Sequence, residues 1–266
     1  MYKIVFFDLD ETLLTDEKTV LAENKEAIAD INKLGVQTVI CSGRQANAVK
    51  LFKDMAGTGR YVICTNGTEI YDYEKNREIY TCEIDKESVQ DLYNFAMQED
   101  LLIKIDTPGI RYVNKMKFAR HEEQEMKIGI EEILEKNILQ ISIGFQNDEL
   151  LEKANEIVSQ HSNIKIENNF TLQDKNEGIH IINIINKEAS KGNAIVKLCE
   201  YLDIKIEDSI AFGDDINDIS MISTVGYGVA MGNARDEIKK IAKEITLSNN
   251  EPGIAKVLRE KIIEVN

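Results

Sequence analysis

Short apolar runs alternate with segments of helical periodicity at both ends of this 266-residue chain. Strand-like runs cover residues 3–7, 36–41 and 60–64, and the stretches Asn24–Leu34 and Ala46–Met55 between them carry apolar residues at helical spacing. The alternation resumes at Lys187, with a helix expected over 191–202 and strands over 208–213 and 227–231. Short strands separated by amphipathic helices build parallel βαβ units. The pattern therefore predicts an α/β fold, a doubly wound parallel sheet of Rossmann-like type with helices on both faces.

The pattern changes in the middle of the chain. Helices are expected near 86–99, 121–136 and 148–160, alternating with apolar segments at 101–107, 138–145 and 178–185. This arrangement predicts a second α/β unit inserted into the first, an open sheet covered by helices on one side. We place the core in residues 1–84 and 185–266 and the insertion in residues 85–184. Just before the insertion, residues 68–82 predict a hairpin that turns at Glu74–Asn76.

The charge and composition of the chain exclude several classes of protein. A net charge of −15 argues against a general binder of nucleic acid or of anionic membranes. No apolar stretch approaches the ~20 residues of a membrane span, and the first residues lack a signal-peptide pattern. The four cysteines are scattered without a CxxC pair, which argues against a zinc site or a disulfide framework. We expect a cytoplasmic protein, and the sequence carries no sign of its oligomeric state.

Three carboxylates follow directly after the first apolar run, at Asp8, Asp10 and Glu11. If that run is a buried parallel strand, the acids lie at its carboxyl end, where open α/β sheets bind ligands. Residues two apart in an extended chain point the same way, so Asp8 and Asp10 can face one site. Carboxylates held close together raise each other's pKa unless a cation lies between them, and Mg²⁺ prefers such oxygen ligands. An acidic turn or helix cap explains this stretch, taken alone, equally well.

A second polar cluster follows the strand expected over 208–213. It contains Asp214, Asp215, Asn217 and Asp218, at the strand end and the first turn of the next helix. Acidic residues also cap helices, but a cap needs one such residue and this cluster offers four polar groups in five positions. A second acidic strand end at the same sheet edge would complete a metal site with Asp8.

Two smaller signals stand where a phosphate group would need them. Ser42 and Gly43 follow the second strand, where a hydroxyl and an unhindered backbone N–H can hold phosphate oxygens. Lys191 opens a helix, an end that binds anions but where the helix dipole disfavours a lysine. That local conflict indicates a task for Lys191, although a solvated surface lysine is the default interpretation.

Taken in order, these motifs resemble those of the haloacid dehalogenase-like (HAD) phosphatases. The matching segments are Asp8-Leu9-Asp10-Glu11-Thr12, Ser42-Gly43-Arg44, Lys191 and Gly213-Asp214-Asp215-Ile216-Asn217-Asp218. The position of the insertion and the stretches "GYGVAMGNA" and "SNNEPGIAKVL" are similar to the Cof-type branch, subclass IIB. The resemblance covers essentially the whole chain, and four motifs in order are far more specific than any one of them.

The resemblance implies a division of labour among these residues. Asp8 would be the nucleophile that attacks phosphorus, and Asp10 would be the general acid and base. Mg²⁺ would be bound by Asp8, Asp214 and the backbone carbonyl of Asp10, with Asp218, and in a lesser role Asp215, in support. Ser42, Gly43 and Lys191 would handle the phosphoryl group, and Asn217 would help to orient the site.

The resemblance also implies that the insertion is a cap that selects the substrate. Arg111 and Lys115, with Lys117 and Arg120, lie in a stretch without acids, residues 107–121, and are candidates for binding a second anionic group or a sugar. A solvated charged surface is the alternative for this stretch. Asn66 and Gly67 resemble the family's substrate-side loop, and Asn233 is a weaker candidate. Glu11 departs from the family, whose members most often have glycine there.

The resemblance thus implies a Mg²⁺-dependent phosphatase that hydrolyses phosphate monoesters of small metabolites, such as sugar phosphates or phosphorylated cofactors, through an aspartyl-phosphate. One alternative is a phosphomutase or phosphotransferase, because an aspartyl-phosphate can pass its phosphate to an alcohol as well as to water. Others are a non-enzymatic phospho-acceptor and an idle binding protein. The chain length, the motif order and the insertion argue against a phospho-acceptor, and the filled catalytic positions argue against an idle protein.

Overall fold

A computed structural model describes residues 1–115, 124–125, 129–174 and 177–265. The chain folds into two compact units. Unit 1 contains Met1–Tyr80 and Ser190–Asn266, and unit 2 contains Thr81–Ala189. The sequence pattern predicted that the chain passes from unit 1 to unit 2 near residue 84 and returns near residue 184. Among the described residues, no helix combines the length and the apolar character that a membrane span requires.

Unit 1 is built on an eight-stranded sheet in the order β14-β13-β12-β1-β2-β3-β4-β5. The pairs from β14 to β3 are parallel, and β4 returns antiparallel to β3. The expected hairpin at residues 68–82 is confirmed, with β4 and β5 as neighbouring strands. The strands are β1 (Ile4–Asp8), β2 (Gln37–Cys41), β3 (Tyr61–Cys64), β4 (Glu69–Asp72), β5 (Arg77–Thr81), β12 (Ser209–Gly213), β13 (Tyr227–Ala230) and β14 (Glu244–Ile245).

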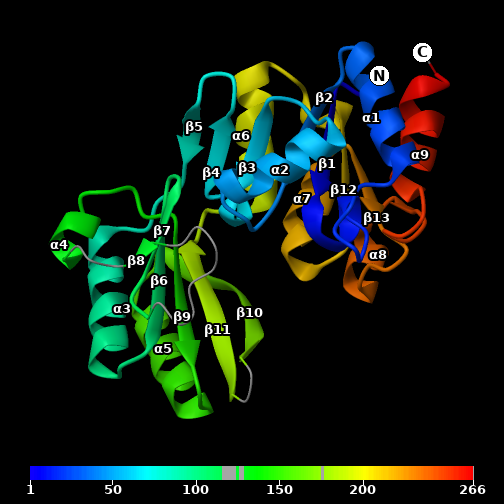
Figure 1. Cartoon of the computed structure of the whole chain (residues 1–266). Helices are drawn as coiled ribbons and strands as arrows, with labels where there is room; N and C mark the ends of the chain where they lie inside the picture. Colours follow the sequence, from blue (N-terminus) through cyan, green and yellow to red (C-terminus); the bar gives the residue numbers. More distant parts are fainter. Residues whose placement is uncertain (116–123, 126–128, 175–176, 266) are drawn as a thin grey trace. The chain divides into compact units, whose positions relative to one another are not determined.

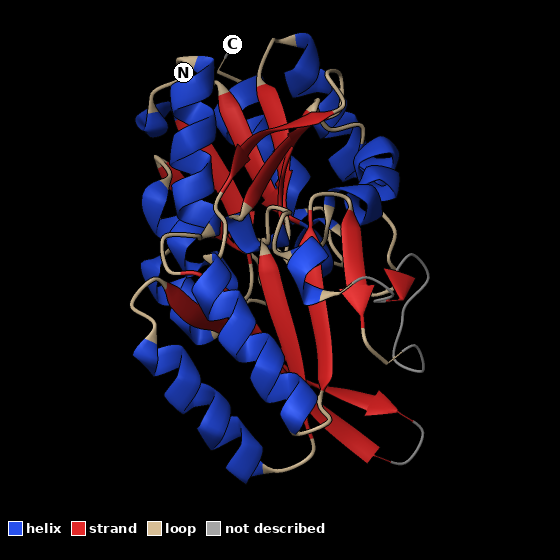
Figure 2. Ribbon diagram, turned by 90° about the vertical axis from the view of Figure 1, so that its left-hand side faces the viewer, coloured by secondary structure: helices blue, strands red, loops and turns tan. Residues whose placement is uncertain are grey.

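Helices cover both faces of this sheet (Figure 2). On one side α1 packs against α9, and elsewhere in the unit α6 packs against α7. Because both faces are covered, every residue of β1 and β12 is buried, and the rings of Phe7 and Phe212 stack with their centroids 5.5 Å apart. The helices are α1 (Ala22–Lys33), α2 (Ala46–Ala56), α6 (Lys191–Leu202), α7 (Ile219–Thr224), α8 (Asp236–Ile241) and α9 (Gly253–Leu258). The predicted doubly wound α/β fold is confirmed.

Unit 2 is a six-stranded sheet in the order β10-β11-β9-β6-β7-β8, with α3 and α5 alongside it (Figure 1). Alternate residues of the central strands, among them Ile103, Ile105, Ile141 and Ile143, form a common apolar core with these two helices. The elements are β6 (Leu102–Thr107), β7 (Ile110–Val113), β8 (Gln124–Glu125), β9 (Gln140–Phe145), β10 (Ile164–Asp174), β11 (Glu177–Asn186), α3 (Lys86–Gln98), α4 (Ile130–Ile133) and α5 (Asp148–Gln160). An open sheet with helices against one face was the arrangement expected.

Three parts of unit 2 differ from the sequence prediction. The helix expected over 121–136 is wrong where the structure describes that stretch: Gln124–Glu125 pair with β7 as a strand, and only Ile130–Ile133 are α-helical. Gly129 stands at the N-cap of α4, and a glycine inside a helix costs about 1 kcal/mol relative to alanine. The other two differences are the strands β7 and β10, which were not predicted; β7 pairs antiparallel with β6, and β10 pairs antiparallel with β11.

Candidate functional site

The carboxyl ends of the central strands of unit 1 bring the motif residues together. Asp8 ends β1, Ser42 follows β2, and Asp214 follows β12; the strands β2 and β12 flank β1 on either side. The parallel register aligns Asp8 with Cys41 and Phe7 with Phe212, so neighbouring strands end at the same level. Lys191 is the first residue of α6 and is far from Asp8 in the sequence, but its side chain lies at the same edge of the sheet, where it donates a hydrogen bond to Asp8. The strand order thus brings to one edge the polar segments that the sequence separates widely.

Lys191 lies at the centre of this site. Its side chain is 0% exposed, and its Nζ donates hydrogen bonds of 2.6 Å to both Asp8 Oδ1 and Asp218 Oδ1. Burial pushes the pKa of Lys191 down, but the charges of Asp218 and Asp8 outweigh it and raise the pKa above its usual value. The lysine is therefore a buried ammonium shared by two carboxylates, which resolves the conflict of a lysine at a helix N-terminus.

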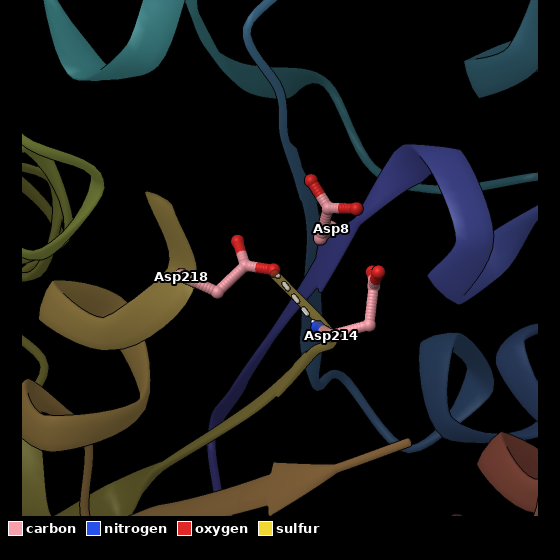
Figure 3. Close-up of side chains that lie close together, drawn as sticks. All are labelled: Asp8, Asp214 and Asp218. Atoms are coloured by element: carbon pink, nitrogen blue, oxygen red, sulfur yellow. Dashed lines mark hydrogen bonds between the residues drawn. The ribbon is translucent and has the colours of Figure 1, made fainter. Parts of the chain in front are cut away.

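Asp8, Asp214 and Asp218 each offer an oxygen within 4.8 Å of the others (Figure 3). Burial raises the pKa of Asp8 well above its usual range, Asp218 and Asp214 add to this, and Lys191 opposes it. Burial also raises the pKa of Asp214 to about 7, against the hydrogen bond from Thr12. With all groups ionised, the three carboxylates and Lys191 leave a formal charge of −2 in a buried place. This donor set fits a hard divalent cation such as Mg²⁺, which prefers carboxylate oxygens.

Both carboxylate oxygens of Asp218 accept hydrogen bonds from other groups of the protein. Its Oδ2 accepts the backbone N–H groups of Asp214 at 2.9 Å and Asp215 at 3.2 Å, while its Oδ1 faces Lys191. Gly213 permits this arrangement, because a Cβ there would lie 2.7 Å from the Asp218 side chain. Asp218 thus holds the Asp214 backbone and Lys191 in place. Asp215 points elsewhere: its carboxylate pairs with Arg235 at 2.5 Å.

The carboxylate of Asp10 does not belong to the buried cluster. Arg44 binds it through two parallel hydrogen bonds, Nε to Oδ2 at 2.8 Å and the second guanidinium nitrogen to Oδ1 at 2.7 Å, and Lys18 Nζ lies 3.1 Å from Oδ1. The Arg44 guanidinium also stacks over the ring of Phe52 at 4.9 Å. Burial alone would raise the pKa of Asp10, but Arg44 and then Lys18 lower it, so Asp10 is ionised in this structure.

Ser42 and Gly43 lie in a loop that is held from behind by the turn Thr65–Gly67. Ser42 is buried, its backbone N–H donates to Ile63 O at 2.9 Å, and its hydroxyl accepts the Arg44 N–H at 3.2 Å. Asn66 is 1% exposed, and its Oδ1 accepts from Asn217 Nδ2 at 3.4 Å. The structure therefore brings Ser42, Asn66 and Asn217 together, with Asn66 inside the protein. Substrate contact by Asn66 and Gly67 stays a prediction.

Glu11 adopts a left-handed backbone conformation, with φ of +62°, and its side chain is exposed. Glycine adopts this conformation without strain, whereas another residue pays roughly 1–2 kcal/mol. The Glu11 carbonyl accepts a hydrogen bond from Asn233 Nδ2 at 2.8 Å, which secures the turn. After burial, the negative charge of Glu11 is one of the smaller causes that raise the pKa of Asp214. The Glu11 carboxylate therefore acts on the acidic cluster through its charge.

The two cations predicted to bind substrate in unit 2 are engaged with carboxylates of their own unit. Arg111 forms a two-pronged ion pair with the buried Asp106, one bond measuring 2.6 Å. Lys115 Nζ lies 3.0 Å from a carboxylate oxygen of Asp100. A role for either in substrate binding stays a prediction, and the Arg111 pair supplies a structural reason for that residue. Lys117 and Arg120 lie outside the described residues.

Two contributors to the site were not singled out from the sequence. Thr12 donates its hydroxyl hydrogen to Asp214 Oδ1 at 2.5 Å, fixing one carboxylate of the acidic cluster. Its signal was present, since Thr12 ends the Asp8–Thr12 motif that resembles the family's. Lys18, whose own φ is +59°, reaches Asp10 from the loop before α1, and no local pattern marks it.

Comparisons with known proteins agree with this architecture. A family model described as haloacid dehalogenase-like hydrolase matches residues 5–258. The 5-amino-6-(5-phospho-D-ribitylamino)uracil phosphatase YcsE of Bacillus subtilis is 29% identical, over 98% of this chain and 96% of that protein. The pyridoxal phosphate phosphatase YbhA of Escherichia coli is 26% identical, over 98% and 99%. The solved structure of a haloacid dehalogenase-like hydrolase from B. subtilis superposes with a TM-score of 0.79 at 26% identity, covering 98% of this chain and 100% of that one.

Proposed function

Because the chain belongs to the haloacid dehalogenase-like hydrolase family, we propose that it is a phosphatase that hydrolyses phosphate monoesters of small metabolites with Asp8 as nucleophile. The observation that carries the proposal is the buried ion cluster at the sheet edge, in which Lys191 bridges Asp8 and Asp218 beside Asp214. A lysine and three aspartates buried together serve no packing purpose. They are the groups that a transferring phosphoryl group requires, a nucleophile and positive charge.

In the first half of the reaction a carboxylate oxygen of Asp8 attacks phosphorus and the bond between phosphorus and the leaving oxygen breaks. Asp10 donates a proton to that oxygen, which departs as an alcohol. In the second half a water molecule attacks the phosphorus of the aspartyl-phosphate, and Asp10 accepts its proton. Inorganic phosphate leaves and the Asp8 carboxylate is restored. The attacking group must be ionised, and the ammonium of Lys191, 2.6 Å from Asp8 Oδ1, favours that state.

The charge that develops on the phosphoryl group needs stabilisation from the protein. Lys191 provides a full positive charge from a site without solvent, where electrostatic interactions are strong. The Ser42 hydroxyl and the Gly43 N–H would add hydrogen-bond donors at the end of β2, since the N–H groups of Ser42 and Arg44 are used within the protein. Gly43 allows this loop to approach Asn66 closely, because a Cβ at position 43 would lie 2.8 Å from Asn66 Oδ1.

Asp8 and Asp214 are the residues that would hold a divalent cation, with Asp218 fixing the backbone behind Asp214. The resemblance adds the backbone carbonyl of Asp10. When bound, Mg²⁺ would supply positive charge against the phosphate oxygens and the two carboxylates. Thr12 orients Asp214 for this task by donating a hydrogen bond to Oδ1, so that Oδ2 is the oxygen that would bind the cation.

Asp10 needs a proton to act as an acid, and in this structure it is ionised by its pairing with Arg44. The pair is partly exposed on both sides, so the guanidinium can leave Asp10 when an anionic substrate competes for it. The two halves of the reaction use Asp10 in opposite protonation states, which suits a carboxylate whose cationic partner is exchangeable.

The class of substrate follows from the relatives. Two of them are named for pyridoxal phosphate and for a phosphorylated ribitylaminouracil, both small phosphate monoesters. The test of the proposal is to incubate the purified protein with Mg²⁺ and a panel of sugar phosphates, pyridoxal phosphate, 5-amino-6-(5-phospho-D-ribitylamino)uracil and p-nitrophenyl phosphate. Release of inorganic phosphate from several of them is expected. Failure to release phosphate from any, with a folded protein and Mg²⁺ present, would refute the proposal, and phosphate passing preferentially to an added alcohol would identify a transferase.

A further inference from the structure

The turn Thr65–Gly67, which follows β3, contacts three separate segments of the site. All three of its residues have left-handed backbone angles, with φ of +49°, +57° and +92°. Thr65 is β-branched, so this conformation is unfavourable for it, whereas Asn66 adopts it more readily, though less freely than glycine. Unfavourable backbone persists where the surroundings hold it in place, and such places gather at functional sites. The turn is buried throughout.

On one side the turn holds the loop that carries Ser42. The Thr65 N–H donates to Arg44 O at 3.0 Å, and the Asn66 N–H donates to Ser42 O at 3.1 Å. The turn thereby uses the carbonyl groups of Ser42 and Arg44, while the Ser42 N–H donates to Ile63 O and the Arg44 N–H donates to the Ser42 hydroxyl oxygen. The hydrogen of the Ser42 hydroxyl can still be donated to a phosphate. The direction of this loop is thus set by the turn.

On the other side the turn lies directly against the start of α6. A Cβ on Gly67 would lie 2.2 Å from Ser190 O and 2.7 Å from Lys191 N, distances that two such atoms cannot keep. Only glycine allows the turn to approach this closely. The backbone of the residue that carries the buried ammonium is therefore in van der Waals contact with the turn, and its Nζ must remain 2.6 Å from Asp8.

The third contact runs through the Asn66 side chain. Its Oδ1 accepts from Asn217 Nδ2 at 3.4 Å and also lies against Gly43. Asn66 thus links the loop after β2 to the segment after β12, across the end of β1.

We propose that the Thr65–Gly67 turn is a positioning element for catalysis, which fixes Ser42, Lys191 and Asn217 relative to Asp8 and does not contact the substrate. This inference rests on the proposed phosphatase function. A residue that contacted the leaving group would affect different substrates differently. A positioning element acts on the phosphoryl group that all substrates share, so its loss lowers kcat by the same factor for each.

The experiment compares Gly67→Ala with Gly35→Ala. Both glycines have left-handed φ, +92° and +81°, but a Cβ on Gly35 meets nothing within 4 Å. The two substitutions therefore share the backbone penalty, and only Gly67→Ala displaces the start of α6. Displacement of a catalytic group by about 1 Å can cost ~10²-fold in rate. We expect kcat of Gly67→Ala to fall by this order, equally for p-nitrophenyl phosphate and for a sugar phosphate, and kcat of Gly35→Ala to stay within about twofold.

Asn66→Gly keeps the test independent of folding. Glycine suits the left-handed φ, which offsets part of the stability lost with the buried side chain, so the variant is expected to remain folded by circular dichroism while kcat falls about 10- to 100-fold from the lost carboxamide link. Full kcat in Asn66→Gly and Gly67→Ala would overturn the proposal. So would a loss confined to KM, or one that differs between the two substrates, because either would indicate substrate contact. A wild type inactive on both substrates would overturn the proposed function and this inference together.

Discussion

The replacement Lys191→Met tests whether the ion cluster is built as the structure shows. Methionine has a similar length, so the change removes the charge while filling most of the space. Two carboxylates that each receive a 2.6 Å hydrogen bond from Nζ, Asp8 and Asp218, then stay buried without that partner. Leaving one partner of a buried ion pair alone costs about 3–5 kcal/mol. For a unit of this size, roughly 2–4 °C per kcal/mol implies a fall in the thermal midpoint of about 6–20 °C.

The loss must also depend on pH in a defined direction. Removing Lys191 takes away the charge that opposes the raised pKa of Asp8, so the folded-state pKa of Asp8 rises further above the value of about 4 in the unfolded chain. The folded variant then binds more protons than the unfolded one, so its free energy of unfolding rises, relative to wild type, as the pH falls. Urea unfolding followed by circular dichroism at pH 7.5 and pH 5.5 measures both quantities.

Two further variants sharpen this test. In Lys191→Met/Asp218→Asn one of the stranded charges is removed, so part of the lost stability should return, with a coupling of at least about 1 kcal/mol. Lys197→Met, on the same helix but exposed, should change stability by no more than about 0.5 kcal/mol. A loss below about 1 kcal/mol in Lys191→Met, or a loss that is the same at both pH values, would refute the ion cluster.

Three other perturbations have expected outcomes. The pKa of Asp214 is raised from 3.8 to about 7, so the stability that this group contributes is present at low pH and is lost as the pH rises through 7. A bound Mg²⁺ offsets the charge of the ionised carboxylate, so Mg²⁺ should raise the thermal midpoint more at pH 8 than at pH 6. An equal rise at both pH values would contradict the assignment of Asp214 as a metal ligand. Thr12→Val removes the 2.5 Å hydrogen bond to Asp214 and should weaken the binding of Mg²⁺ about tenfold, whereas Thr12→Ser should not. Calorimetric titration of Mg²⁺ into both variants measures the two affinities, and equal affinities would contradict this role of Thr12. Arg44→Met should raise the pKa of Asp10 and move the basic limb of the kcat/KM profile to higher pH, and an unmoved limb would separate Asp10 from proton transfer.

Most of the core fold could be predicted because its signals are local. Buried parallel strands read as continuous apolar runs, and the helices between them have clear periodicity. The strand β10 was missed although its first four residues, "IKIE", alternate apolar and polar side chains as a half-buried strand does; two asparagines follow and interrupt the pattern, and the pairing with β11 is irregular at that point. It is a strand because β11 pairs with it along nearly its whole length, which is a tertiary cause. The prediction of a helix at 121–136 was also wrong for a tertiary reason, since Gln124–Glu125 pair with the edge of β7 as a strand.

The convergence of the site could be predicted because parallel strands end at one edge of the sheet. Asp8, Asp214 and Lys191 meet there, and the misplaced charge at a helix start marked Lys191 beforehand. The two-pronged contact between Arg44 and Asp10 could not be predicted, because it joins two loops whose conformations the sequence pattern does not specify. In unit 2 the acid-free stretch around Arg111 indicated a binding surface, yet its partner Asp106 is five residues earlier, on the neighbouring strand.

The most direct test of the account is phosphate release by Asp8→Asn. The variant keeps the shape of the side chain and loses the nucleophile, so with Mg²⁺ and p-nitrophenyl phosphate its kcat should fall by about 10⁴-fold or more. The control is Asp54→Asn, an exposed residue of α2 that should keep the full rate. Acid quenching during turnover should leave one phosphoryl group on the peptide that contains Asp8 in the wild type and none in the variant. Turnover by Asp8→Asn at the rate of Asp54→Asn would contradict the central claim.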